Sequence, residues 1–255
     1  MKNRPVNKNL KWIVLVIFCL VCWIIYSTTN GKSKFIQTNG KPNQLKLVQT
    51  NEESNACCKK APDYVSPQLF QPGVFITPQE ADYIINKSKK NMKRSTLLSK
   101  TKISNRDRIS KTHWMKKNDP VTNKIISRVL DHIKKTEGLD IPFENCESLQ
   151  VVHYGPGNFY RPHFDTCVSN DKEICKQFRA RGGERIRTVI VGLNEQGKDY
   201  QGGYTSFPNL GVKYRLPKSS ALMFHTLDKQ MKGNHKLSLH GGDDVTQGEK
   251  WIANI

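Results

Sequence analysis

The sequence has no acidic residue near its N-terminus and almost none in one internal stretch. Residues 1–46 contain eight lysines and arginines and no Asp or Glu, and residues 87–117 contain twelve against Asp107 alone. The remaining segments nearly balance, although the formal net charge is +19. This distribution excludes a uniformly basic protein. The internal stretch is either a solvated face or a surface for an acidic partner, nucleic acid or a membrane.

The cysteines do not form a recognisable framework. Two of the seven lie in an apolar run, and the other five lack zinc-finger spacing (Cys57, Cys58, Cys146, Cys167 and Cys175). The pattern therefore excludes a zinc ribbon and a disulfide-rich scaffold. A Cys167–Cys175 disulfide, which requires an oxidising compartment, and free thiols at both positions are the two alternatives.

An unbroken apolar run extends from Trp12 to Tyr26. It is short for a bilayer span of about 20 residues, but uncharged neighbours extend it to Thr29. Basic residues precede it, and no small-x-small cleavage motif follows it. We expect residues 12–29 to be an uncleaved transmembrane signal anchor, with residues 1–11 in the cytosol and the later part of the chain in the lumen. A removed signal peptide and a buried helix are the alternatives.

Helix signals follow a polar linker at residues 30–64. Thr77-Pro78-Gln79-Glu80 has the residues of a capping box with proline at the first helical position. A second helix is predicted after Asp119-Pro120, where apolar residues recur at helical spacing. Residues 65–146 are therefore expected to form a helical support.

Residues 147–255 change to short strand patterns separated by Gly, Pro, Asn and Asp. The predicted strands are Leu149–Tyr154, Arg187–Leu193, Ala221–Phe224 and Leu237–His240. Two helices followed by many short strands predict an α+β fold, a β-sandwich or jelly roll buttressed by helices.

Three residues could bind one metal ion. His163 and Asp165 are two positions apart, so on a strand they would share a face. His240 ends an alternating segment, and we expect the following turn to form a hairpin that places Lys250 on the neighbouring strand. Two histidines and a carboxylate on one face of an iron ion leave three positions open for a chelating 2-oxo acid and O2. Lys250 would then bind the other carboxylate of that acid. Of the remaining histidines, His225 is the strongest candidate for a supporting role.

Several segments together resemble the prolyl 4-hydroxylases of the collagen type and their plant, algal and viral relatives. The likeness covers roughly residues 65–255. It rests on ESLQVVHYGPGNFYRPHFD, RTVIVGLN, GGYTSFPNLGVKYRLPKSSALMF and SLHGGDDVTQGEKWIAN, and more weakly on RISKTHWM at Arg108–Met115.

The resemblance implies a double-stranded β-helix that catalyses peptidyl-proline 4-hydroxylation with Fe(II), 2-oxoglutarate and O2, and with L-ascorbate as a further cofactor. It implies a proline-containing or collagen-like substrate. The expected anchor and its orientation place the catalytic domain in the endoplasmic reticulum lumen or elsewhere in the secretory pathway. By position the resemblance makes His163, Asp165 and His240 the iron ligands and Lys250 the 2-oxoglutarate anchor. Pocket positions match at Tyr154, Tyr160 and Thr188.

Two departures from the family pattern leave substrate choice open. Tyr204 replaces the Glu of a Gly-Gly-Glu-Thr turn, and Asp243-Asp244 replaces Cys-Pro after the distal histidine. A peptidyl-lysine hydroxylase, or another 2-oxoglutarate-dependent hydroxylase, is the alternative activity, and a metal-free module for proline-rich chains is the alternative outside enzymes. A nucleic-acid demethylase would be expected to use Arg where this chain has Lys250, so no nucleic-acid partner is expected.

The basic stretch from Lys87 to Lys117 includes the RISKTHWM segment. The resemblance implies a mobile loop over the peptide groove, and we expect Ser95–Trp114 to be such a lid. Its cations would favour proline-containing chains with acidic neighbours.

Overall fold

The computed structural model describes residues 46–48, 67–96, 107–167, 172–180, 183–228 and 233–255. All of them belong to the second of two compact units, Gln44–Ile255. The expected anchor at residues 12–29 and nearly all of the expected linker lie outside the described residues. None of the described helices is both long enough and apolar enough to cross a membrane.

Both predicted helices are present. Helix α2 (Pro78–Ser88) begins after Thr77, whose side chain accepts from the Glu80 backbone while the Glu80 carboxylate accepts from the Thr77 backbone. This reciprocal pair satisfies two amide donors that the first turn leaves without helical partners. Helix α3 (Pro120–Glu137) begins after Asp119, which accepts from two amides of the first turn.

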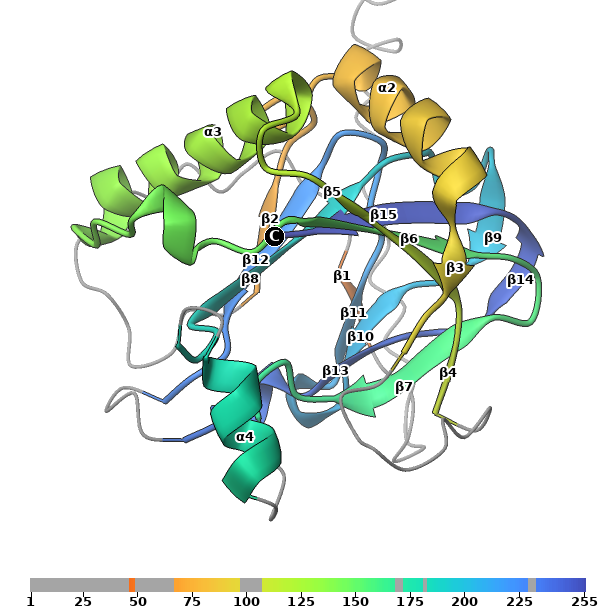
Figure 1. Ribbon diagram of the computed structural model, residues 1–255. Helices are drawn as coiled ribbons and strands as arrows, with labels where there is room; N and C mark the ends of the chain where they lie inside the picture. Colours follow the sequence, from red (N-terminus) through yellow and green to blue (C-terminus); the bar gives the residue numbers. More distant parts are fainter. Residues whose placement is uncertain (1–45, 49–66, 97–106, 168–171, 181–182, 229–232) are drawn as a thin grey trace, which may run out of the picture. The chain divides into compact units, whose positions relative to one another are not determined.

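The strands of the described residues form two large sheets and one small one (Figure 1). The six-stranded sheet has the order β1 (Lys46–Val48), β11 (Val212–Tyr214), β10 (Thr205–Phe207), β13 (His240–Gly242), β7 (Phe159–His163) and β4 (Arg108–Ile109). The seven-stranded sheet has the order β2 (Gln68–Phe70), β12 (Ala221–His225), β8 (Arg187–Gly192), β15 (Lys250–Asn254), β6 (Leu149–Tyr154), β5 (Lys111–Met115) and β3 (Lys93–Arg94). Strands β14 (Val245–Gly248) and β9 (Tyr200–Gly202) pair with each other.

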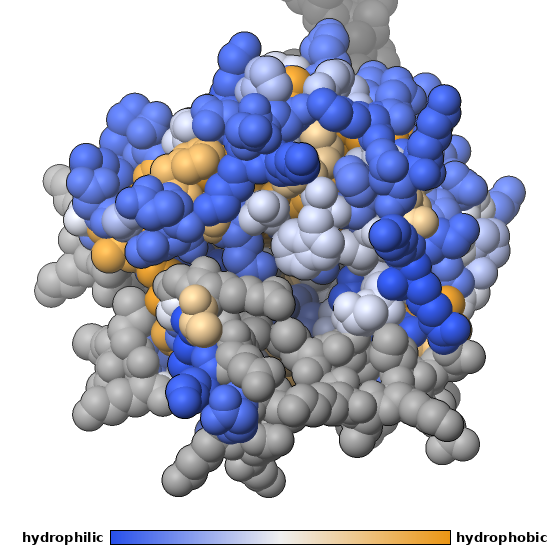
Figure 2. Space-filling view, viewed as in Figure 1, coloured by the Kyte–Doolittle hydropathy of each residue, from blue (hydrophilic) through white to orange (hydrophobic). Residues whose placement is uncertain are grey.

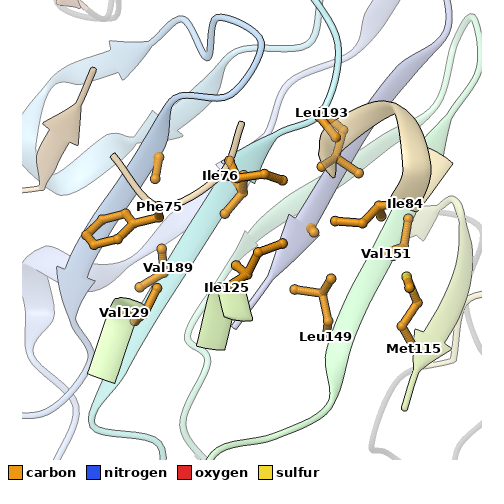
Figure 3. Packing of buried hydrophobic residues seen from close by; sticks show 14 of the residues in the cluster. Phe75, Ile76, Ile84, Met115, Ile125, Val129, Leu149, Val151, Val189 and Leu193 are labelled. Carbon is orange, nitrogen blue, oxygen red and sulfur yellow. The ribbon is translucent and has the colours of Figure 1, made fainter. Parts of the chain in front are cut away.

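Helices α2 and α3 cover one face of the seven-stranded sheet (Figures 1 and 3). Ile84, Ile125 and Val129 from the helices pack on Leu149 and Val151 from β6 in one apolar cluster. All five are at most 2% exposed, so truncating Ile84, Ile125 or Leu149 to Ala is expected to cost about 2–5 kcal/mol of stability.

The other face of the same sheet turns toward the six-stranded sheet. Because strand side chains alternate between faces, β6 places Val152 and Tyr154 in a second apolar cluster. That cluster also contains Phe207 and Tyr214 from the six-stranded sheet. The predicted sheet-rich α+β architecture is confirmed, with a core on each face of the seven-stranded sheet.

The structure corrects two of the predicted elements. Leu237–His240 is not a strand: residues Lys236–Ser238 form a 3-10 turn, and β13 begins at His240. Within the expected lid, the described part forms β4 and β5, and β5 pairs along its whole length with β6. Residues 97–106, which carry Lys100, Lys102 and Arg106, lie outside the described residues.

A short helix, α4 (Lys172–Arg179), was not predicted. Cys175 in this helix forms a disulfide with Cys167, so the structure favours the first of the two alternatives for this pair. Cys146 is a free thiol, and burial raises its pKa to about 11.

Candidate active site

Pairing between β7 and β13 brings the two histidines together. His163 ends β7, His240 begins β13, and the two are register partners. Asp165 lies two residues beyond the end of β7, in the segment that follows the strand. Its carboxylate lies 3.5 Å from His163 Nε2 and 3.6 Å from His240 Nε2. The three side chains form the one group of potential metal ligands found among the described residues, with ligand atoms within 4.8 Å of one another.

Backbone carbonyls fix the tautomer of both rings. His163 Nδ1 lies 2.9 Å from the Arg161 carbonyl oxygen, and His240 Nδ1 lies 3.0 Å from that of Ser238. A carbonyl can only accept, so each Nδ1 carries a proton, and Nε2 is the ring nitrogen left to bind a metal ion. This is the arrangement that orients histidine as a metal ligand.

Asp165 is kept ionised and oriented. Burial alone would raise its pKa, but His240, His163 and Arg185 outweigh burial and hold the pKa well below its usual value. The Thr188 hydroxyl donates to Asp165 Oδ2 at 2.7 Å, and Arg185 donates to its backbone carbonyl at 3.2 Å. In the structure, therefore, Thr188 contacts the carboxylate of the metal-ligand group.

Lys250 reaches the site from a different strand than predicted. Strand β15 belongs to the seven-stranded sheet, whereas His240 is in the six-stranded sheet, so the two are not on neighbouring strands. The turn after β13 leads into β14, and the chain then crosses between sheets before Lys250. The hairpin prediction failed because sheet membership depends on long-range packing, which local turn residues do not reveal.

The Lys250 ammonium group is buried with one hydrogen-bond partner among the described residues. The side chain is 2% exposed, and Nζ donates to the Gly203 carbonyl oxygen at 2.6 Å. Burial lowers its pKa to about 8, partly opposed by the charge of Asp243. A cation in this position is stabilised by any anion that enters the cavity.

The Gly202-Gly203 turn allows the Lys250 side chain to approach the backbone and donate to the Gly203 carbonyl oxygen. Both glycines have positive φ angles, 70° and 62°. A Cβ at Gly202 would lie 2.5 Å from the Asp244 carbonyl oxygen, and one at Gly203 would lie 3.1 Å from Lys250 Cδ. Larger residues would be strained here and would crowd the lysine.

Aromatic rings pack around the histidines. The Tyr160 ring stacks on His163 with centroids 3.5 Å apart, and Phe224 lies 4.7 Å from His240. Tyr154 is the register partner of Lys250 and is 4% exposed. Burial raises the pKa of Tyr160 to about 12, so its phenol stays protonated at neutral pH.

One cavity of about 630 Å³ contains all seven predicted site residues in its lining: Tyr154, Tyr160, His163, Asp165, Thr188, His240 and Lys250. The same cavity has lining residues that the sequence did not single out, including Glu147 and Arg185. These two form a bidentate pair at 2.7 and 2.9 Å. No local motif marks either residue. The signal that could have pointed to them is their position in the sequence, since Glu147 lies just before β6 and Arg185 just before β8.

His225 does not support the metal-ligand group. It ends β12, and because side chains alternate, its neighbour Phe224 faces His240 while His225 faces away. Its Nε2 lies 3.6 Å from Glu137 at the end of α3, and Arg187 also pairs with Glu137. These contacts lower the pKa of Glu137 to about 2, although burial alone would raise it. The cluster joins α3 to the sheet.

Comparisons with known proteins place the site in a family. The sequence model of the 2OG-Fe(II) oxygenase superfamily matches residues 149–255. A provisionally named prolyl 4-hydroxylase of Acanthamoeba polyphaga mimivirus is 40% identical over 58% of this chain and 57% of its own length. Prolyl 4-hydroxylase subunit alpha-3 of Homo sapiens is 32% identical over 75% of this chain and 34% of its own length.

A solved structure agrees with these relatives. The viral collagen prolyl hydroxylase of Paramecium Bursaria Chlorella virus-1, in complex with 2OG, has a TM-score of 0.56 and 27% identity. It covers 78% of this chain and 96% of its own. The chain belongs to the prolyl 4-hydroxylase family of the 2OG-Fe(II) oxygenase superfamily. It spans about a third to just over half the length of the two curated relatives above.

Proposed function

We propose that this chain hydroxylates prolyl residues of peptides at C4, using Fe(II), O2 and 2-oxoglutarate. One observation carries the proposal: a two-histidine, one-carboxylate group and a buried lysine line the same cavity. The family membership supports the same reaction class. The products would be 4-hydroxyproline, succinate and CO2.

The residues fit an iron ion on chemical grounds. The Nε2 atoms of His163 and His240 lie near the Asp165 carboxylate, and two imidazoles with one carboxylate suit Fe(II) while leaving positions open. The ion would separate and neutralise groups that now contact one another directly. The Thr188 hydroxyl would hold Asp165 in place as a ligand.

The residues also fit 2-oxoglutarate. Lys250 would bind the carboxylate farther from the metal, and Tyr154 and Tyr160 would line the space between. Each buried charge would then have a partner, as burial requires. When bound, iron and 2-oxoglutarate supply an oxidative decarboxylation that is coupled to hydroxylation of a carbon–hydrogen bond. L-Ascorbate would serve as the reductant that keeps the metal in the ferrous state.

The chain's own groups would hold and orient the reactants. The two histidines and Asp165 would fix the metal on one wall of the cavity, and Lys250 would fix the co-substrate from the opposite sheet. Apolar residues of the inner cluster, such as Ile190 and Ile252, also line the cavity and would limit access of water. A positioned proline ring would then present C4 to the metal's open side.

The test is mass spectrometry of proline-rich and collagen-like peptides after incubation of the full chain with Fe(II), 2-oxoglutarate and O2. The expected result is a gain of one oxygen atom, located at C4 of proline and absent with His163→Ala. Oxygen located on lysine would favour the alternative peptidyl-lysine hydroxylase. Peptide binding without oxygen transfer or succinate would favour a non-catalytic module.

We further propose that residues 12–29 anchor the chain as a single-pass type II membrane protein, with the catalytic domain in the lumen of the endoplasmic reticulum. The apolar run supports this, and the Cys167–Cys175 pair is compatible with an oxidising compartment. Deleting residues 1–30 should turn a carbonate-resistant membrane protein into a soluble one that keeps its activity. Recovery of the uncleaved full chain in the soluble fraction would contradict the anchor.

A further inference from the structure

Strands β3 and β5 form the outer end of the site cavity, at one edge of the seven-stranded sheet. The cavity lining there includes Lys93 and Arg94 of β3 and Trp114 of β5. The Trp114 side chain is 45% exposed, so this part of the cavity is open. Figure 2 shows strongly hydrophilic side chains over the position of β3.

Strand register shows which cations face the cavity. Lys93 is paired with Thr112, and Arg94 is paired with Lys111. Thr112 is a lining residue whose hydroxyl contacts Ser95 Oγ at 2.6 Å. Paired residues share a face of the sheet, so Lys93 lies on the cavity face. Lys111 is exposed and does not line the cavity.

The carboxylates of the cavity are already engaged elsewhere. Among the described lining residues there are two, Glu147 and Asp165. Glu147 is paired with Arg185, and Asp165 belongs to the metal-ligand group. Among the described residues, the β3 end of the cavity therefore presents positive charge and no carboxylate.

We propose that Lys93 binds an acidic side chain of the peptide substrate and so favours prolines with an acidic neighbour. This inference rests on the proposed function, because it specifies the substrate of the same site. Strand β3 is three strands from β15, which is roughly 14 Å at ~4.8 Å per strand. A proline-rich chain in the polyproline II conformation advances ~3.1 Å per residue. The hydroxylated proline lies beside the metal-ligand group, so the acidic residue is several residues away from it along the peptide.

The experiment compares matched proline-rich peptides that carry Asp, Asn or Lys at each position up to six residues on either side of one acceptor proline. The full chain should prefer Asp over Asn by about two- to fivefold in kcat/KM, the range for one partly exposed ion pair. The preference should be confined to positions several residues from the acceptor proline. It should shrink as salt is added.

Charge reversal on the two faces of the sheet edge supplies the control. Lys93→Glu should abolish or invert the Asp preference, and Lys93→Gln should reduce it. Lys111→Glu makes the same change in net charge on the other face and should leave the preference in place. An equal loss in the Lys93→Glu and Lys111→Glu variants would overturn the inference, because only overall charge would then matter.

Binding of the same peptides, measured by fluorescence anisotropy, separates this inference from the proposed function. If Asp peptides bind more tightly and Lys93→Glu removes the difference, the inference stands even where no peptide is hydroxylated. If hydroxylation occurs but rates and affinities are equal for the Asp, Asn and Lys peptides, the proposed function stands and the inference is overturned.

Discussion

Replacing Lys250 by methionine should raise the requirement for 2-oxoglutarate without unfolding the protein. Methionine has a similar length and no charge, so the substitution removes the ammonium group and largely keeps the packing. Among the described residues, the one hydrogen bond lost is the donation from Nζ to the Gly203 carbonyl. The affected step is therefore binding of the co-substrate.

The magnitude follows from the burial of Lys250. Burial lowers its pKa from 10.5 to about 8, which corresponds to about 3 kcal/mol at 1.36 kcal/mol per pKa unit. A carboxylate placed beside the ammonium group would recover most of this energy. A loss of about 2–3 kcal/mol raises the dissociation constant for 2-oxoglutarate roughly 30- to 150-fold.

The assay is succinate formation as a function of 2-oxoglutarate at fixed Fe(II) and peptide, together with Fe(II) binding and thermal unfolding. Iron affinity and Tm should change little in Lys250→Met, because removing a buried cation offsets the lost hydrogen bond. Lys218→Met is the matched control: Lys218 pairs with Asp82 at 2.6 Å and does not line the cavity. An unchanged 2-oxoglutarate requirement in Lys250→Met would refute the assigned role.

Three further predictions concern the same site. Alanine at any one of the three proposed iron ligands (His163, Asp165 and His240) should abolish turnover and weaken Fe(II) binding, measured by equilibrium dialysis. Near-normal activity of one of these variants would show that the replaced residue is not an iron ligand. The affinity for 2-oxoglutarate should be constant below pH 8 and fall above it, because Lys250, with its lowered pKa of about 8, loses the proton that the carboxylate needs. The apparent dissociation constant should be about tenfold higher one pH unit above that pKa. Calorimetric titrations that show no such rise would contradict this prediction. Gly203→Ala should lower stability by about 1–2 kcal/mol, because alanine is strained at a φ of 62°. It should also raise the 2-oxoglutarate requirement, because the added methyl group would contact Lys250. A Tm and a 2-oxoglutarate requirement equal to those of the wild type would contradict the close packing.

Much of the helical part could be predicted because its signals are local. The Thr77 and Asp119 caps both direct side-chain oxygens to amides of the first turn, and such bonds depend on a few adjacent residues. Strand β6 was predicted with its observed bounds, Leu149–Tyr154, because a run of β-branched and aromatic residues lies between turn residues. The spacing of apolar residues, with a period of about 3.6 in helices and two in strands, can be recognised directly in the sequence.

The errors arose where contacts are long-range. The sequence placed Lys250 beside His240, but the chain changes sheets between them, and only packing decides that change. Residues 236–238 alternate like a strand but form a 3-10 turn that accommodates the entry into β13. The segment around β5 is polar and weakly periodic because it lies near a sheet edge, with Thr112 facing the cavity and Lys111 facing solvent.

The metal-ligand residues were predictable for two different reasons. His163 and Asp165 are close in sequence, so their closeness in space required little of the fold. His240 is far away; it was predicted from an alternating segment that proved not to be a strand, and also from the resemblance to a family. The supporting contacts of Thr188 and Arg185 with Asp165 depend on where β8 lies relative to β7, which no local pattern reveals.

The central claim is that iron, 2-oxoglutarate and a prolyl substrate react in the one cavity that His163, Asp165, His240 and Lys250 line. The most direct test is to measure hydroxyproline and succinate formed in the same reaction, with and without Fe(II). We predict equal amounts of the two products with a proline-containing peptide, and neither product without the metal. Succinate formed without any hydroxyproline across the full set of proline-rich peptides would contradict the account.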